Sequence, residues 1–263
     1  VSELLLETGS TKINLKEAAV VNMFKGKKLS YEAIFGETFI SKSDVENILP
    51  FIDLKQIPHF KNAELTNTYI KGFTDSIYAE PDLKTQYGSL SGSAGFFFAD
   101  TLNPNFSLDL TAERLNIAPI AGSNDLRSSL NIKIKGNGRG TDLDRLDAFF
   151  NIFSWDSDIA GYTYDTFTFK GNIKNQSMTY DSLLLVLSYS EEEMPETVIE
   201  YDSSYIFSSG NIDISDFKKP EYNLNLDYRN LNLALLFDSK DFPQQLSGSL
   251  SVKGSGINPD SLE

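Results

Sequence analysis

Apolar and polar residues alternate with a period of two along most of the chain. Phe106, Leu108 and Leu110 alternate with polar residues, and the segment 222–228 repeats the arrangement. Successive side chains of a β-strand point to opposite faces, so the alternation predicts strands with one apolar and one polar face. By this pattern the chain is all-β, with roughly twenty antiparallel or mixed strands and one or two short helices.

The apolar positions of these strands define one candidate surface. We expect them to form the floor of an elongated sheet. The candidate residues are Phe96, Phe98, Phe106, Leu108, Leu110, Ile132, Ile134, Phe167, Phe169, Leu183, Leu185, Leu187, Tyr222, Leu224, Leu226, Tyr228, Leu231, Leu233, Leu250 and Val252.

Three segments have a more specific pattern. Residues 65–71 read as one strand, and residues 183–187 are apolar at every position, which predicts burial on both faces. The order Ser43-Asp-Val-Glu46 fits a capping box and predicts a short helix that Pro50 limits.

One long pattern occurs twice. The segments that begin at Phe106 and Tyr222 share an aromatic residue, alternating leucines, a Leu-Asn-aliphatic motif and a Lys-Gly-x-Gly motif, about 116 residues apart. A repeat of long period predicts an array whose units pack on their neighbours. No Pro, Ser or Gly-rich linker divides it, so residues 1–263 are expected to be one continuous β segment of a longer protein.

The apolar faces admit two arrangements. They could pack on each other in a sandwich or a two-layer solenoid. Alternatively, the sheet could curl into a half-pipe (β-taco) whose apolar interior stays partly open to a ligand. About twenty strands spaced ~4.8 Å apart would give a trough on the order of 90 Å long.

Charge and composition exclude several functions. The formal net charge is −14, which argues against nucleic acid and against electrostatic docking on anionic lipid. The absence of cysteine excludes disulfides, thiolate metal sites and cysteine catalysis.

Candidate catalytic motifs are weak. Gly136-x-Gly138-x-Gly140 resembles a phosphate loop but lacks a βαβ setting, and turn glycines explain it better, as they do Gly254 and Gly256. The aspartates at 142–147 and 156–158 match no calcium loop and are typical of turns. His59 is the single histidine, so no triad or ordinary zinc site can form. The sequence therefore predicts no enzyme, cofactor or metal.

The second copy of the repeat resembles a known family. The segment 246–262, together with 203–214 and 231–235, resembles the recurring unit of the TamB and AsmA-like family. The resemblance covers about residues 100–263. Residues 1–99 resemble the family in their general β-strand pattern more than in specific motifs.

The resemblance carries its own expectations. It implies a β-taco that is anchored in the inner membrane of a Gram-negative bacterium and crosses the periplasm to an Omp85-type outer-membrane partner, TamA or a relative. It implies transport of phospholipid along an apolar groove between the two membranes. The alternative is a scaffold that assists the insertion of outer-membrane proteins.

Overall fold

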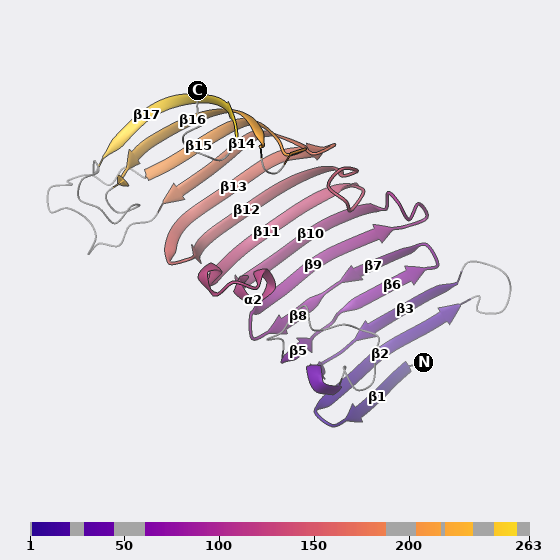
Figure 1. Cartoon of the computed structure of the whole chain (residues 1–263). Coiled ribbons are helices and arrows are strands. Elements are labelled where there is room, and N and C mark those ends of the chain that lie inside the picture. The colour runs from indigo at the N-terminus through magenta and orange to yellow at the C-terminus, as the bar shows by residue number, and fades with distance from the viewer. Residues whose placement is uncertain are drawn as a thin grey trace, which may run out of the picture. The chain divides into compact units, whose positions relative to one another are not determined.

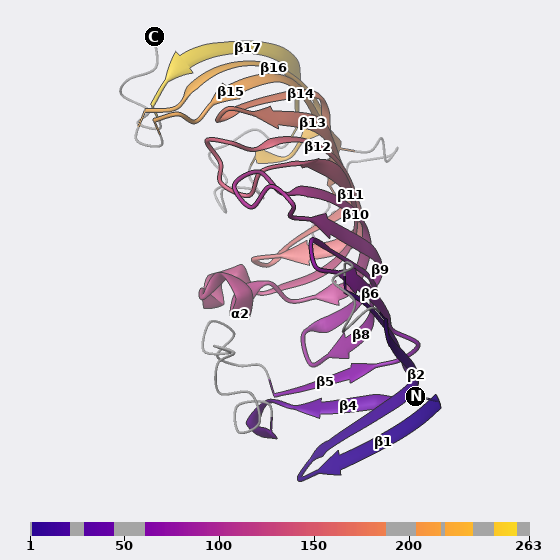
Figure 2. The same ribbon diagram turned by 90° about the vertical axis from the view of Figure 1, so that its right-hand side faces the viewer.

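The computed structural model describes residues 2–21, 29–44, 61–187, 204–216, 219–233 and 245–256. Within them the fold is nearly all β, and 17 strands form one antiparallel sheet (Figures 1 and 2), which confirms the predicted fold class. Residues 42–44 are helical, so Ser43 lies inside the first turn and is not its N-cap. The remainder of the helix predicted there, and His59, fall outside the described residues.

The strands follow one another with few helical insertions. Two short helices, α2 (Ala118–Ala121) and η2 (Asn124–Leu126), separate β10 from β11. The strands are β1 (Ser2–Thr8), β2 (Thr11–Val21), β3 (Ser30–Phe35), β4 (Thr38–Ser41), β5 (Asn62–Leu65), β6 (Tyr69–Phe73), β7 (Ser76–Glu80), β8 (Asp82–Thr85), β9 (Gly88–Phe97), β10 (Asn105–Leu115), β11 (Ser128–Arg139), β12 (Asp147–Ile159), β13 (Tyr162–Lys174), β14 (Ser177–Leu187), β15 (Ser204–Asp213), β16 (Glu221–Leu231) and β17 (Leu246–Ser255).

The chain divides into two compact units. Unit 1 comprises Val1–Lys135 with Ile159–Gly161, and unit 2 comprises Gly136–Asp158 with Tyr162–Glu263. In unit 2, strands β13 to β17 form a meander in which each strand pairs antiparallel with the next. This connectivity needs only short turns, so neighbours in the sequence are neighbours in the sheet.

At three positions of the sheet in unit 1, two short strands lie end to end where one long strand would fit, and we call each such pair a row. The long strand β2 pairs with both β3 and β4, and the long strand β9 pairs with both β7 and β8. Between them, β3 pairs with β6 and β4 with β5, so each row consists of two short strands (Figure 2). The single strand predicted over residues 65–71 is therefore wrong, because Asn67 has φ +49° and separates β5 from β6.

Threonine hydroxyls bridge the interruptions. Thr68 Oγ1 accepts a hydrogen bond from the Asp82 amide at 3.0 Å and donates to the Asp82 carbonyl at 3.3 Å. One row away, Thr38 Oγ1 accepts from the Asn14 amide at 3.0 Å and donates to the Asn14 carbonyl at 3.3 Å. Both threonines are buried. The hydroxyls thus satisfy the two amides where the backbone ladder is interrupted, and the carbonyls also accept from the Thr66 and Gly36 amides. We call this line the threonine seam.

Three of the predicted turn glycines lie inside strands. Gly136 and Gly138 belong to β11 and Gly254 to β17, so the turn interpretation is wrong for them. A Cβ on Gly136 would lie 2.8 Å from the Phe150 ring, and one on Gly254 would lie 2.8 Å from the Tyr222 hydroxyl. Glycine is present because an aromatic side chain of the neighbouring strand occupies this space.

The Leu-Asn-aliphatic motif of the repeat ends a strand. In the first copy, β10 ends at Leu115, and Asn116 Oδ1 accepts hydrogen bonds from the amides of Ala118 and Ser128. Helix α2 then begins, with Pro119 in its first turn and Gly122, at φ +68°, after its end. In the second copy, β16 likewise ends at Leu231. The repeat therefore marks where a strand leaves the sheet.

Replacing Thr68 by valine tests the seam. Thr68→Val keeps the shape but removes the acceptor of the Asp82 amide, whereas the Asp82 carbonyl keeps the Thr66 amide at 2.9 Å. The change should lower the free energy of unfolding by about 1–3 kcal/mol, the cost of one unsatisfied buried donor. Thr179→Val, at an exposed site on β14, is the matched control and should change it by less than about 0.5 kcal/mol. Urea unfolding followed by circular dichroism measures both. Equal effects would show that the seam hydroxyls are dispensable.

Candidate functional site: the apolar sheet faces

The register of unit 2 brings the predicted apolar residues onto one face. Directly paired residues of adjacent strands point the same way. Leu226 pairs with Leu250 on β17 and with Ser208 on β15, which pairs in turn with Leu183 on β14. Leu183 pairs with Phe169 on β13. Five strands therefore present these positions on a common surface.

This apolar face of unit 2 contains most of the candidates from its strands. The members predicted from the sequence are Phe167, Phe169, Leu183, Leu185, Leu187, Tyr222, Leu224, Leu226, Tyr228, Leu250 and Val252. The register adds Ile173, Met178, Tyr180, Ile206 and Ile212, which sequence reasoning missed. On β15 the alternation is hidden by Ser208 and Gly210. Ser208 Oγ lies 2.8 Å from the Tyr180 hydroxyl, so the small residue accommodates the ring.

Unit 1 has an apolar face of its own. Phe106 pairs with Phe96, which pairs with Ile77, and the two phenylalanine rings lie 6.3 Å apart. Leu108 pairs with Ala94, and Leu110 with Gly92. The missed members Leu90, Ile77 and Ala94 come from short or glycine-rich strands whose alternation is too brief to detect.

Two salt bridges place Ile132 and Ile134 on the same side. Lys133 and Lys135 both reach the Asp109 carboxylate, at 3.5 and 2.9 Å. Asp109 lies on the polar face of β10, between Leu108 and Leu110. Because the two lysines point to that polar face, the isoleucines between and before them point to the apolar face.

Two predicted residues lie beyond strand ends. Phe98 follows the end of β9, and its amide donates to the Asp75 carbonyl at 2.8 Å. Leu233 lies beyond the end of β16. Leu231 is buried and pairs with Leu246, which has the same parity on β17 as Leu250, so the bulge after Tyr228 keeps Leu231 on the apolar face. Strand ends cannot be located by alternation alone, and this explains the positions of Phe98 and Leu233.

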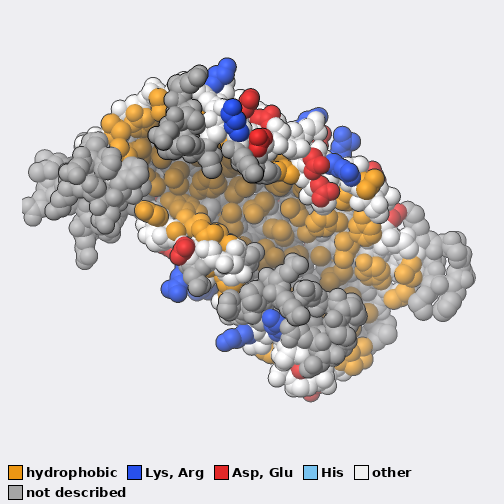
Figure 3. Space-filling view, viewed as in Figure 1, with side chains coloured by type: hydrophobic (Ala, Val, Ile, Leu, Met, Phe, Trp, Pro, Cys, Tyr) orange, Lys and Arg blue, Asp and Glu red, His pale blue; other side chains and the backbone are white. Residues whose placement is uncertain are grey.

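The apolar faces are only half covered. Among the described residues the fully buried hydrophobic side chains are few and mostly alanine, whereas Leu250 is 52% and Phe96 39% exposed. Figure 3 shows the hydrophobic side chains gathered on the face turned to the viewer. The described residues of either unit thus lack the dry two-layer core that a sandwich requires.

Strand β14 departs from the prediction of burial on both faces. All five residues from Leu183 to Leu187 are half-buried, and none is fully buried. Leu184 and Val186 point to the polar face, where they pair with Phe207 and Tyr205. The continuous apolar run therefore reflects two partly exposed apolar surfaces, one on each face.

The polar face of unit 1 is organised by charge. The hydrogen bond from Lys135 lowers the pKa of the Asp109 carboxyl below its ordinary value of 3.8, partial desolvation opposes this, and Lys133 lowers it further. Desolvation raises the pKa of Tyr69, and the hydrogen bond to Glu32 raises it further. The hydrogen bond to Glu80 raises the pKa of Tyr78. These tyrosines therefore remain protonated donors at neutral pH.

No three His, Cys, Asp or Glu side chains among the described residues are placed to hold a metal ion. In the same residues no helix has the length and apolarity to cross a membrane. Comparison with protein-family models, with curated proteins and with solved structures found no match.

Removing the Asp109 carboxylate should change the acid sensitivity of unit 1. Its lowered pKa means that its contribution is fully present above the ordinary value of 3.8 and is lost as pH falls through the folded-state pKa. Asp109→Asn should therefore be less stable than the unmodified protein at pH 7, with the difference shrinking below about pH 4. Lys135→Gln should act similarly and Ser107→Ala should not. Thermal unfolding between pH 3 and 7 measures this, and a constant difference would contradict it.

Proposed function

We propose that this chain is a non-enzymatic lipid conduit that holds acyl chains against the apolar faces of its two units. The observation that carries the proposal is the half exposure of contiguous Leu, Ile, Phe and Tyr side chains across successive strands. Exposed apolar surface of this extent is uncommon without a binding function. An acyl chain matches it chemically, because the face presents few groups that could orient a polar ligand.

The free energy of transferring an acyl chain to water favours a lipid ligand over a small polar molecule. Transfer of an acyl chain of ~16 carbons from a bilayer to water costs roughly 12–13 kcal/mol, at about 0.8 kcal/mol per CH₂. An apolar strand face offsets much of this cost wherever the chain lies. Binding would then vary little with position along the face, which permits sliding. No single residue would be indispensable.

The cellular setting of the proposal rests on the family resemblance. In that setting the protein carries phospholipid through the periplasm between inner and outer membranes, is anchored to the inner membrane, and meets an Omp85-type partner such as TamA through regions beyond the described strands. The acidic net charge of −14 fits a protein that does not dock on anionic headgroups. Contacts between lipid and individual residues of this protein can be tested directly.

Photocrosslinking can locate lipid on one face. A photoreactive residue in place of Leu108 or Leu226 should capture phospholipid in Gram-negative cells, whereas one in place of Ser107 or Asn225, on the adjacent polar-face positions, should not. Mass spectrometry of the adducts gives the yields, and about a tenfold difference is expected. Equal yields on both faces would refute the proposal. Adducts with nascent outer-membrane proteins would instead support the scaffold.

Charges on the apolar face should block lipid binding without unfolding the protein. Leu226→Arg and Ile134→Glu place a charge where an acyl chain would lie, and both sites are half-exposed, so the charge can remain solvated. Lipid recovered with the purified protein should fall about tenfold, with circular dichroism unchanged. Asn225→Arg, on the opposite face of β16, is the control. Undiminished lipid in a variant carrying both charges would exclude the conduit.

A further inference from the structure

Six strands of unit 1, β2, β3, β6, β7, β9 and β10, begin or end at one edge of its sheet. Val21 pairs with Ser30, which pairs with Phe73. Phe73 pairs with Ser76, which pairs with Phe97. Figure 1 shows β2, β6 and β9 ending at this edge. One line of directly paired residues thus contains the last residues of three strands and the first residues of two.

This line lies on the polar face of the sheet, yet its larger side chains are apolar. Phe96 belongs to the apolar face, so the adjacent Phe97 and the residues paired in its line point to the polar face. Val21, Phe73 and Phe97 are between 39% and 52% exposed. On the apolar face Val20, which lies in the line of Phe96, is exposed as well. This edge therefore exposes apolar side chains on both faces.

A loop carries one more leucine beyond the same edge. Residues 98–104 connect β9 to β10, and the Phe98 amide donates to the Asp75 carbonyl in the turn between β6 and β7 at 2.8 Å. The Asp100 carboxylate accepts hydrogen bonds from the amides of Leu102 at 3.1 Å and Asn103 at 3.3 Å. Leu102, in the loop held by these bonds, is 63% exposed. We define the apolar rim of unit 1 as Val20, Val21, Phe73, Phe97 and Leu102.

We propose that the apolar rim inserts into a phospholipid bilayer and brings the apolar face of unit 1 into contact with lipid. A protein partner packs on one face of a sheet, whereas the rim is exposed on both faces and beyond the edge. A bilayer surrounds an inserted edge on all sides, so it covers these side chains together. Two residues of a strand span about 7 Å, which is comparable to the ~5–10 Å to which apolar surfaces enter the boundary between headgroups and acyl chains.

The charges at this edge favour a bilayer without net charge. In the described ranges 20–21, 30–31, 72–77 and 96–106, the charged residues are Asp75 and Asp100. No lysine or arginine in these ranges attracts anionic headgroups, so insertion depends on apolar contact. A zwitterionic phospholipid such as phosphatidylcholine is therefore the lipid that fits these residues.

A hollow at this edge adjoins both the rim and the apolar face. Its volume is about 280 Å³, and its lining includes Ile77, Phe96 and Phe106 of the apolar face together with Phe97 and Asn105 at the strand ends. A lipid in contact with the rim thus lies beside side chains that are proposed to hold acyl chains. Passage of lipid from the rim to that face rests on the proposed function, whereas insertion of the rim does not.

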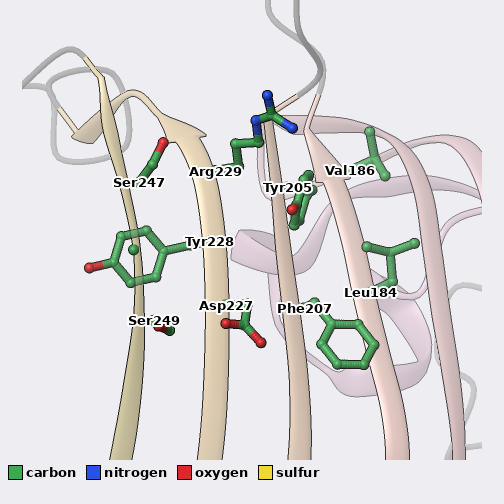
Figure 4. A pocket seen from close by; sticks show the side chains of 10 residues that line it. Leu184, Val186, Tyr205, Phe207, Asp227, Tyr228, Arg229, Ser247 and Ser249 are labelled. Atoms are coloured by element: carbon green, nitrogen blue, oxygen red, sulfur yellow. The ribbon is translucent and has the colours of Figure 1, made fainter.

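A second apolar hollow, on the polar face of unit 2, does not fit a bilayer. Its volume is about 730 Å³, and Leu184 and Phe207 lie there beside Asp227 and Arg229 (Figure 4). Charged side chains among the apolar ones make insertion into hydrocarbon costly. This surface therefore supplies a control that has aromatic and aliphatic side chains but is not expected to insert.

Flotation with phosphatidylcholine vesicles tests the rim. At about 1 mM lipid the protein should float with the vesicles, since even the ~10⁴ M⁻¹ partition constant of one myristoyl chain would carry about nine tenths of it. Leu102→Ser and Phe97→Ser should each lower the partition constant about tenfold, because one inserted apolar side chain is lost. Leu5→Ser, at a site on β1 that is 55% exposed but lies outside the rim, and Phe207→Ser should leave it unchanged. Added salt should not weaken binding, because the contact is apolar.

The outcomes separate the rim from the conduit. Circular dichroism verifies that each variant is folded, and Leu102→Ser changes only an exposed loop. A protein that does not float, rim variants that float as well as Leu5→Ser, or binding that salt abolishes would each overturn the proposal. Lipid captured at Leu108 or Leu226 by crosslinking tests the conduit separately. Flotation lost with capture retained contradicts the rim alone, whereas capture lost with flotation retained supports the rim and contradicts the conduit.

Discussion

The backbone hydrogen-bond ladder is the interaction on which each unit depends. A globular domain holds its strands together partly by pressing them against a second layer, but the described residues provide no such layer. Adhesion must then come from strand to strand, through ladder bonds and through side chains that touch across neighbouring strands. This explains why side-chain hydrogen bonds are found where the ladder is interrupted. At the threonine seam, hydroxyls of buried side chains bond both polar groups of the opposing backbone.

Because the strands must hold to one another without a second layer, each face of the sheet uses its own kind of side-chain contact between neighbouring strands. On the polar face, ion pairs such as those of Asp109 with Lys133 and Lys135 link neighbouring strands without demanding a covering layer. On the apolar face, aromatic rings reach sideways, as Phe169 does toward Tyr180 at 5.9 Å. Glycines in strands make room for this lateral packing. The rings of Phe150 and Tyr222 lie beside Gly136 and Gly254 in this way, and side chains such as Leu250 remain exposed.

Period-two alternation was enough to predict the fold class and the membership of the apolar faces in β10, β13 and β16. It succeeded there because those strands are long and the bulges in β13 and β16 lie near their ends, so parity fixes the face of the residues between them. It failed where a strand breaks or ends although the apolar–polar alternation continues in the sequence. Asn67 breaks an apparently continuous strand, and Phe98 and Leu233 lie just past strand ends.

The glycines show why local sequence was not sufficient. Gly-x-Gly suggests a turn because glycine tolerates φ > 0, yet the reason for Gly136 and Gly254 lies in a ring on the neighbouring strand. Likewise, the run of five apolar residues in β14 predicts that both faces of the strand are apolar. It does not identify the residues of the neighbouring strands that lie beside them. Only the register, which pairs Leu184 with Phe207, reveals a second apolar surface. Information of that kind resides in pairs of residues far apart in the sequence.

The threonine seam has a consequence for how unit 1 can change in evolution. Inserting one residue into a strand exchanges its two faces. In β9, which spans ten residues, an insertion near the start would turn most of the strand inside out. In the rows between β2 and β9 the ladder is already broken, at residues 36–37, 66–68 and 81, so an added residue there need not alter the parity of either flanking strand. The seam is thus a line along which the length of the chain can vary while the apolar face keeps its composition.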